Sequence, residues 1–156
     1  MNFLTTISVR AFSTCLLAFL LVAKTMFAAD WPIWGGNGSR NMVSFEKGIN
    51  LDFDPGRMDE DEVVDMKTTK NIKWIAKLGS QAYGNVTVAD GRVYAGTNNE
   101  SPRDPTKKGD RGIVMCFDEK TGKLNWQLVI PKLGAGKVSD WEYIGICSSP
   151  AIEGNR

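Results

Sequence analysis

Histidine is absent from this sequence of 156 residues. Its absence excludes from the sequence a Ser-His-Asp or Cys-His catalytic centre, a histidine-ligated metal and a Cys-x-x-Cys-His haem site. Excess charge of either sign is also lacking, because 19 basic residues face 18 acidic ones. A nucleic-acid-binding surface would show a basic stripe, so we expect no nucleic-acid partner. Any chemistry would depend on carboxylates, amides, Arg, Lys, Ser or Cys.

Cysteine is scarce, with three residues in the whole sequence. Cys15 lies in an apolar N-terminal run, which leaves Cys116 and Cys147 as the pair that an exported protein could oxidise. Cys116 occupies a small apolar position within a predicted strand. Nothing in the sequence brings the two within the ~6 Å between Cα atoms that a disulfide needs. We therefore favour two buried free thiols over a disulfide.

Long apolar runs are lacking too, except for Ala11–Ala23 near the N-terminus. That run is shorter than the roughly 20 apolar residues of a membrane-spanning helix. Arg10 precedes it and the small residues Ala28 and Ala29 follow, which is the pattern of a secretory signal peptide. Residues 1–29 therefore predict a signal helix and export to the periplasm or cell envelope. Membrane contact would be limited to this segment, if it stays uncleaved as an anchor.

Residues 112 to 128 predict a β-hairpin. In Gly112–Asp118 both alternating sets of side chains are apolar, as in a strand buried on two faces. In Leu124–Leu128 apolar and polar residues alternate, as in a half-buried strand. Gly122 can take the positive φ of a tight turn, and the Asp118 carboxylate can accept from the backbone N–H groups that follow it. Such a hairpin suits a sheet wedged between similar sheets, as in a propeller blade.

A second hairpin precedes the first. In Asn85–Thr97, the dipeptide Asp90-Gly91 joins two short β-rich runs, which is a strong hairpin signal. The beginning of this pattern returns 64 residues later, at Pro150–Arg156. Together the two hairpins supply the four strands of one blade.

A further outer strand is predicted upstream, over Asn71–Leu78, where Trp74 takes the position that Trp126 has in the first hairpin. The intervals between these partial repeats are near or above the roughly 40–50 residues typical of blade repeats. They indicate a repeat architecture rather than a single isolated hairpin.

The first hairpin resembles the repeat of pyrroloquinoline-quinone (PQQ) type β-propellers, whose pattern is A-x-D-x-x-T-G-x-x-x-W. Asp118, Thr121, Gly122 and Trp126 stand at the family spacing, and Cys116 replaces the first alanine. The resemblance extends upstream, where Trp31-Pro-Ile-Trp34-Gly and Ser39-Arg-Asn-Met42 are similar to the start of an exported, planctomycete-like subset of that family. It implies an all-β, partial β-propeller over residues 71–156, about one blade plus flanking strands.

Because one blade cannot bury both of its faces, we expect the chain to be an N-terminal fragment of a longer propeller, truncated at its C-terminus. A small complete β domain with similar hairpins is the alternative.

Residues 30–70 form a separate extension in this interpretation, between the signal peptide and the repeat region. Its tryptophans are predicted to lie across the propeller and to insert aromatic rings into it. Its acidic stretch, Asp52–Asp65, lacks the EF-hand spacing and its central glycine, so a solvated loop is favoured over a calcium loop.

The resemblance also names candidate cofactor residues. In quinoprotein dehydrogenases a glutamate holds Ca²⁺ beside PQQ, and an Arg-Gly follows before the repeat hairpin. Glu100, with Asn98 beside it, would be the metal ligand here, and Arg111 would pair with the anionic quinone. An insertion separates Glu100 from Arg111, and the adjacent Cys-Cys pair of many such enzymes is absent. A solvated loop with a structural Arg111 is the favoured interpretation.

The sequence is compatible with three functions. We favour a non-catalytic exported propeller that serves as a binding or scaffold module, with its loops contacting a protein or a small ligand. The alternative is part of a PQQ- and calcium-dependent dehydrogenase that oxidises an alcohol or sugar. The third is a truncated product without independent function, which would aggregate or lack cooperative melting.

Overall fold

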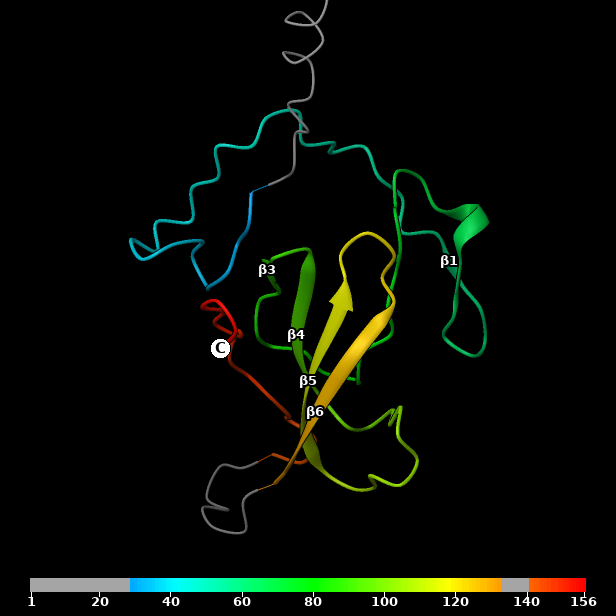
Figure 1. The fold of residues 1–156 in the computed structure, drawn as a ribbon. Helices are drawn as coiled ribbons and strands as arrows, with labels where there is room; N and C mark the ends of the chain where they lie inside the picture. Colours follow the sequence, from blue (N-terminus) through cyan, green and yellow to red (C-terminus); the bar gives the residue numbers. More distant parts are fainter. Residues whose placement is uncertain (1–28, 133–140) are drawn as a thin grey trace, which may run out of the picture.

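The fold is built from antiparallel strands, which confirms the all-β prediction. The computed structural model describes residues 29–132 and 141–156, and the predicted signal helix lies outside them. Its elements are β1 (Arg57–Met58), β2 (Val64–Asp65), the short 3₁₀ helix η1 (Met66–Thr68), β3 (Thr87–Ala89), β4 (Arg92–Asn98), β5 (Arg111–Asp118) and β6 (Leu124–Pro131). β1 and β2 form a small hairpin, and β3-β4-β5-β6 form one four-stranded sheet in chain order (Figure 1).

Both predicted hairpins are present in the four-stranded sheet. Asp90 and Gly91 join β3 to β4 with φ values of 51° and 70°, as a type I′ turn requires. β5 begins one residue before the predicted strand, and β6 continues past Leu128 to Pro131. The local pattern therefore predicted the meander, although not its full length.

The turn between β5 and β6 is held by its own side chains. The Asp118 carboxylate accepts from the Thr121 backbone N–H at 2.8 Å and from the Thr121 hydroxyl at 2.7 Å. These bonds hold the pKa of Asp118 below its usual range. Gly122 takes a φ of 70° and donates its N–H to the Asp118 carbonyl at 2.8 Å. The predicted turn chemistry is thus observed.

One face of the sheet is covered by the chain that precedes β3. Ile113, Met115 and Phe117 are buried on this face against residues 74–78. The Trp74 indole packs near Phe117, donates its Nε1–H to the Glu119 carbonyl at 2.8 Å, and lies over Gly122. The predicted outer strand over Asn71–Leu78 is wrong, because this segment crosses the sheet face and has no strand beside it to complete a ladder.

The opposite face is covered only in part. Ala89, Tyr94 and Cys116 are buried there against Ile152. Ile146 lies over Gly96 and Gly112, where any Cβ would come within 2.8 Å and 2.6 Å of its side chain. Farther out, β6 exposes three large side chains, which are Trp126 (47%), Leu128 (52%) and Ile130 (38%).

The N-terminal extension closes the inner edge of the sheet. Trp31 forms an antiparallel bridge with Val88 of β3, and the Pro32 carbonyl accepts from the Ile152 N–H at 2.9 Å. Figure 1 shows these blue residues beside the red C-terminal segment. Trp31 therefore extends the sheet with its ring against Gly36, and Trp34 is half exposed. The insertion of these rings into a propeller stays a prediction.

Two smaller expectations also need correction. The acidic stretch predicted as a solvated loop contains the β1–β2 hairpin and ends at Asp65, the N-cap of η1, whose side chain accepts from the Lys67 N–H. Cys116 and Cys147 are both free, as expected, but only Cys116 is buried and Cys147 is exposed.

Candidate functional site

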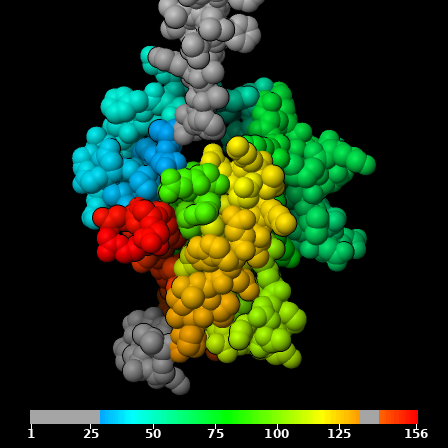
Figure 2. Space-filling view, in the orientation of Figure 1, coloured from blue at the N-terminus to red at the C-terminus, as the bar shows by residue number. Residues whose placement is uncertain are grey.

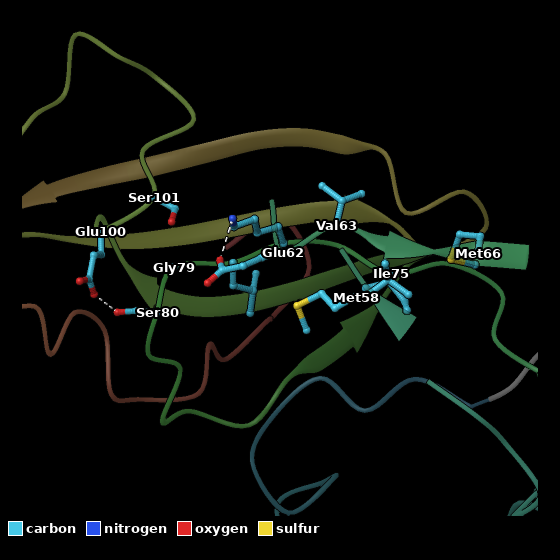
Figure 3. Close-up of a pocket in the computed structure, with 12 residues that line it drawn as sticks. Met58, Glu62, Val63, Met66, Ile75, Gly79, Ser80, Glu100 and Ser101 are labelled. Atoms are coloured by element: carbon cyan, nitrogen blue, oxygen red, sulfur yellow. Dashed lines mark hydrogen bonds and ion pairs between the residues drawn. The ribbon is translucent and has the colours of Figure 1, made fainter. Parts of the chain in front are cut away.

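A groove of about 820 Å³ lies between the β1–β2 hairpin and the chain that covers the sheet (Figure 3). Its apolar lining comes from both sides and comprises Met58, Val63, Val64, Met66, Ile75 and Leu78. Its polar residues are Glu62, Lys77, Ser80, Glu100 and Ser101, together with the backbone of Gly79. The groove is thus apolar at one end and hydroxyl- and carboxylate-lined at the other.

The polar end is fixed by Glu100 and Ser80. The Ser80 hydroxyl donates to the Glu100 carboxylate, and Figure 3 shows the two side chains meeting across the groove from different segments. Nearer the apolar end, Lys77 and Glu62 form an ion pair at 2.9 Å, which is more than half exposed on the glutamate side. The single positive charge in this lining is therefore already paired, and Glu100 gives the polar end a negative character.

The end of β4 positions this site through Asn98, of which 1% is exposed. Its Oδ1 accepts from the Ser80 and Glu100 backbone N–H groups, both at 3.1 Å. Its Nδ2 donates to the Ser80 hydroxyl at 2.8 Å and to the Tyr143 carbonyl at 2.5 Å. A single buried amide thus joins both sides of the groove's polar end to the C-terminal segment.

Thr97 supports the same connection from the other face of β4. Its buried hydroxyl accepts from the Gly79 N–H at 2.9 Å and donates to the Gln81 carbonyl at 2.7 Å. Gly79 packs so closely that an added Cβ would lie 2.1 Å from the Asn98 Oδ1. The groove wall at residues 79–81 is consequently a fixed surface rather than an independent loop.

The three predicted cofactor residues lie at one end of the sheet. Asn98 pairs with Gly112 across β4 and β5, which places Arg111 and Glu100 at the same end. Asn98 and Glu100 join the groove network described above. The Arg111 Nε donates to the Lys108 carbonyl at 2.9 Å, within its own loop, and among the described residues no hydrogen bond or ion pair joins it to the other two.

These residues as placed do not assemble a calcium site. Calcium takes six to eight oxygen ligands, but the Asn98 oxygen already accepts two backbone N–H groups. Across residues 29–132 and 141–156, no three His, Cys, Asp or Glu side chains come together as a metal would require. The assignment of Glu100 to a metal and of Arg111 to a quinone therefore stays a prediction, and no chemical step is derived from it.

Asp110 is a structural anchor that the sequence did not indicate. It is partly buried, pairs with Lys132 at 2.6 Å and accepts from the Tyr143 N–H at 2.9 Å. Partial burial opposes ionisation, but these two donors outweigh it and hold the pKa of Asp110 below its usual range. Asp110 thereby joins the loop before β5 to the end of β6 and to the C-terminal segment.

The groove itself was missed because its walls are distant in sequence. The available signals were Gly79-Ser80, a turn pair before the second hairpin, and the apolar residues Met58, Val63 and Val64 within the acidic stretch. Neither signal shows that the two segments face one another.

No family model matches the chain, and comparison with curated proteins and with solved structures finds no match. Within the described part of the chain, no helix has the length and apolar character needed to cross a membrane. The function is therefore argued from the geometry and from the sequence pattern.

Proposed function

We propose that this chain is part of an exported PQQ-like β-propeller and serves as a binding or scaffold module. The observation that carries the proposal is the pair of tryptophans on opposite faces of the sheet. Trp74 covers the Gly122 turn on one face, and Trp126 holds the corresponding position in the next repeat, where 47% of it is exposed. A sheet with one covered and one open aromatic position fits a unit that stacks on a similar unit.

The C-terminal segment supports the same proposal. Glu153 and Arg156 exchange backbone hydrogen bonds at 2.8 Å and 3.0 Å across a tight turn. Their counterparts in the predicted repeat, Ala89 and Arg92, pair across the β3–β4 turn. The sequence repeat thus has a matching local geometry at both places.

The groove supplies the binding surface of this module. Its apolar lining and its acidic, hydroxyl-bearing end suit a ligand or peptide segment with an apolar body and a donor or cationic end. The network of Asn98 and Thr97 holds the polar end in place, which limits the ordering cost of binding.

An internal duplication tests the stacking. Inserting a second copy of residues 75–126 directly after Trp126 preserves the spacing of the predicted repeat, in which Trp74 and Trp126 take the same position. We expect the duplicated chain to melt at a higher temperature than the original, with the first Trp126 shifted to blue fluorescence as the added turn covers it. The control is the same duplication with the first Trp126→Ala, which should lose the gain. An unchanged melting temperature in the duplicated chain would contradict the proposal.

A titration separates the scaffold from the dehydrogenase. We expect tryptophan fluorescence and equilibrium dialysis to show no saturable binding of PQQ with calcium. Saturable, calcium-dependent binding that Glu100→Gln and Arg111→Met both abolish would instead favour the cofactor assignment.

Export is tested separately by fusing residues 1–40 to a reporter enzyme that is active only outside the cytoplasm. Reporter activity that Leu17→Arg abolishes supports the signal peptide, because a charge in the apolar core prevents its recognition. Absence of activity in the unaltered fusion would contradict it.

A further inference from the structure

A second pocket lies away from the groove, where three segments that are distant in sequence meet. Its volume is about 560 Å³. Its walls come from the N-terminal extension at residues 33–40, from the chain before β3 at residues 83–85, and from the C-terminal segment at residues 147–151. Figure 2 shows the blue extension and the red C-terminal segment packed against each other on the surface of the molecule.

The three walls are held together by close backbone contacts. The Asn85 N–H donates to the Ser149 hydroxyl at 2.8 Å, which joins the chain before β3 to the C-terminal segment. Gly84 packs against the same segment so closely that an added Cβ would lie 2.6 Å from a backbone oxygen. The Pro32 carbonyl accepts from the Ile152 N–H at 2.9 Å, which joins the extension to that segment as well. The pocket is thus formed before a ligand enters, which limits the ordering cost of binding.

Arg40 is the only charged residue among the described residues that line this pocket. Its N–H donates to the Asn37 carbonyl at 3.0 Å, and its Cα lies against Gly35, where an added Cβ would come within 2.7 Å. Its φ of 52° is left-handed, and non-glycine residues in that region are concentrated at ligand sites. Within residues 29–132 and 141–156, its guanidinium has no hydrogen-bond or ion-pair partner. The pocket therefore carries an unpaired positive charge on a backbone that is held in place.

The rest of the lining combines aromatic rings with hydroxyl groups. Trp34 is 51% exposed and Tyr83 is 56% exposed, so both rings keep surface that a ligand can cover. Ser148 and Ser149 also line the pocket. The Ser149 oxygen accepts from the Asn85 N–H and keeps its own hydrogen for donation. A cation, apolar ring surface and hydroxyl groups are thus available together.

We propose that this pocket binds a hexuronate, which is a pyranose sugar that carries a carboxylate. The carboxylate pairs with Arg40, because the planar guanidinium matches the two carboxylate oxygens. The C–H face of the sugar ring packs on Trp34, with Tyr83 as a second ring surface, and the sugar hydroxyls exchange hydrogen bonds with the two serines. The pocket shares no lining residue with the groove, so this proposal does not depend on what the groove binds.

Other small ligands use only part of this lining. Inorganic phosphate pairs with Arg40 but leaves both aromatic rings in water. An aliphatic or aromatic acid covers the rings but makes no use of the serine hydroxyls. A neutral hexose meets the rings and the hydroxyls but leaves the Arg40 charge without a partner. A sugar acid uses all three, and the pocket volume of about 560 Å³ has room for one such ring.

Isothermal titration calorimetry of the full-length chain tests the ligand class. The probes are D-galacturonate, its linear trimer, D-galactose and inorganic phosphate. We expect galacturonate to bind at least about tenfold more tightly than galactose or phosphate, because each of these lacks a group that the pocket recognises. The affinity for galacturonate, but not for galactose, should fall as the salt concentration rises. A trimer that binds more tightly than the monomer identifies a polysaccharide as the source of the ligand, and one that does not identifies the free sugar acid.

Three variants assign the binding to this pocket. Arg40→Gln removes the charge, Trp34→Ala removes a ring, and Arg57→Gln is the matched control, because Arg57 is exposed and outside the lining. We expect Arg40→Gln to weaken galacturonate binding at least about tenfold and to leave galactose binding nearly unchanged. Trp34→Ala should weaken the binding of both sugars, and Arg57→Gln should change neither. Circular dichroism should be the same for all three variants, since the altered side chains are exposed.

Several results would overturn the proposal. They are the absence of saturable binding of galacturonate and its trimer, equal affinity for galacturonate and galactose, and phosphate binding as tight as that of galacturonate. Unchanged sugar binding in Trp34→Ala, or a loss in Arg57→Gln as large as that in Arg40→Gln, would overturn it too.

Discussion

At the scale of a residue, two glycines with the same φ distinguish the cost of backbone strain from the cost of displacing a packed side chain. Gly91 and Gly122 both have a φ of 70°, but a Cβ on Gly91 meets no atom within 4 Å, whereas one on Gly122 would lie 2.5 Å from the Trp74 ring. We expect Gly91→Ala to lower the free energy of unfolding by about 1–2 kcal/mol through the left-handed backbone alone. Gly122→Ala should cost about 2–5 kcal/mol, because displacement of Trp74 is added.

Urea denaturation of both variants measures the difference. In the Trp74→Ala background the two glycine substitutions should cost nearly the same, since the added Cβ then has space. Equal costs in the unaltered background would contradict the packing of Trp74 over the turn.

The Asp118 carboxylate makes the stability of the β5–β6 turn depend on pH. The hydrogen bonds from Thr121 hold its pKa below the unfolded value. Its contribution is therefore complete above the unfolded pKa of about 3.9, and it is lost as the pH falls through the lower folded pKa. We expect the difference in stability between the unaltered protein and Asp118→Asn to shrink as the pH is lowered from 6 to 2. Thermal melts across that range measure it, and a difference that does not depend on pH would contradict this role.

Some of the roles of single residues could be predicted from the sequence. Asp118, Thr121 and Gly122 were predictable because turn chemistry is local, since each bond joins residues at most five positions apart. Asn98 was predicted as a calcium neighbour, and its role as a buried structural amide was not foreseen, because its partners at residues 80 and 143 are distant in sequence.

At the scale of elements, the end of β4 holds its neighbouring segments in place through the hydrogen bonds of Asn98. Asn98→Ala would leave the Ser80 and Glu100 N–H groups without their shared acceptor. We expect this substitution to lower the free energy of unfolding by about 2–4 kcal/mol, since each unpaired, partly buried donor costs about 1–3 kcal/mol.

The neighbouring amide provides the control. Asn99 donates only to the Lys107 and Gly109 carbonyls of its own loop. Asn99→Ala should cost less than about 1 kcal/mol, because Lys107 and Gly109 lie in an exposed loop and their carbonyls can accept from water instead. Hydrogen exchange at residues 79–81 should accelerate only in the Asn98 variant. Similar exchange in both variants would show that Asn98 does not hold the groove wall.

The elements that the sequence predicted correctly are those joined by short turns. The β3–β4 and β5–β6 hairpins follow from alternation and a glycine turn. The segment Asn71–Leu78 has the composition of a strand, but composition does not distinguish an edge position from a position across a sheet face. In the structure this segment lies across a sheet face, where Trp74, Ala76 and Leu78 pack against the core.

At the scale of the whole molecule, the four-stranded sheet and the segment on its face should unfold as one unit. Met115 is buried between them with 2% exposed, whereas Met58 is 63% exposed in the groove. We expect Met115→Ala to cost about 2–5 kcal/mol through the cavity it leaves and Met58→Ala less than about 0.5 kcal/mol. Calorimetry should give a single transition for the unaltered chain, and separate transitions or equal costs would contradict a shared core.

The placement of Trp31 and Pro32 has a consequence for the order of folding. They lie between Val88 and Ile152, so one end of the described chain is held by residues near its other end. Local hairpins can close as soon as their turns are synthesised, but this contact spans most of the sequence and carries a large loop-closure entropy. The contact of Pro32 with Ile152 should therefore form last, and only after synthesis has passed Ile152.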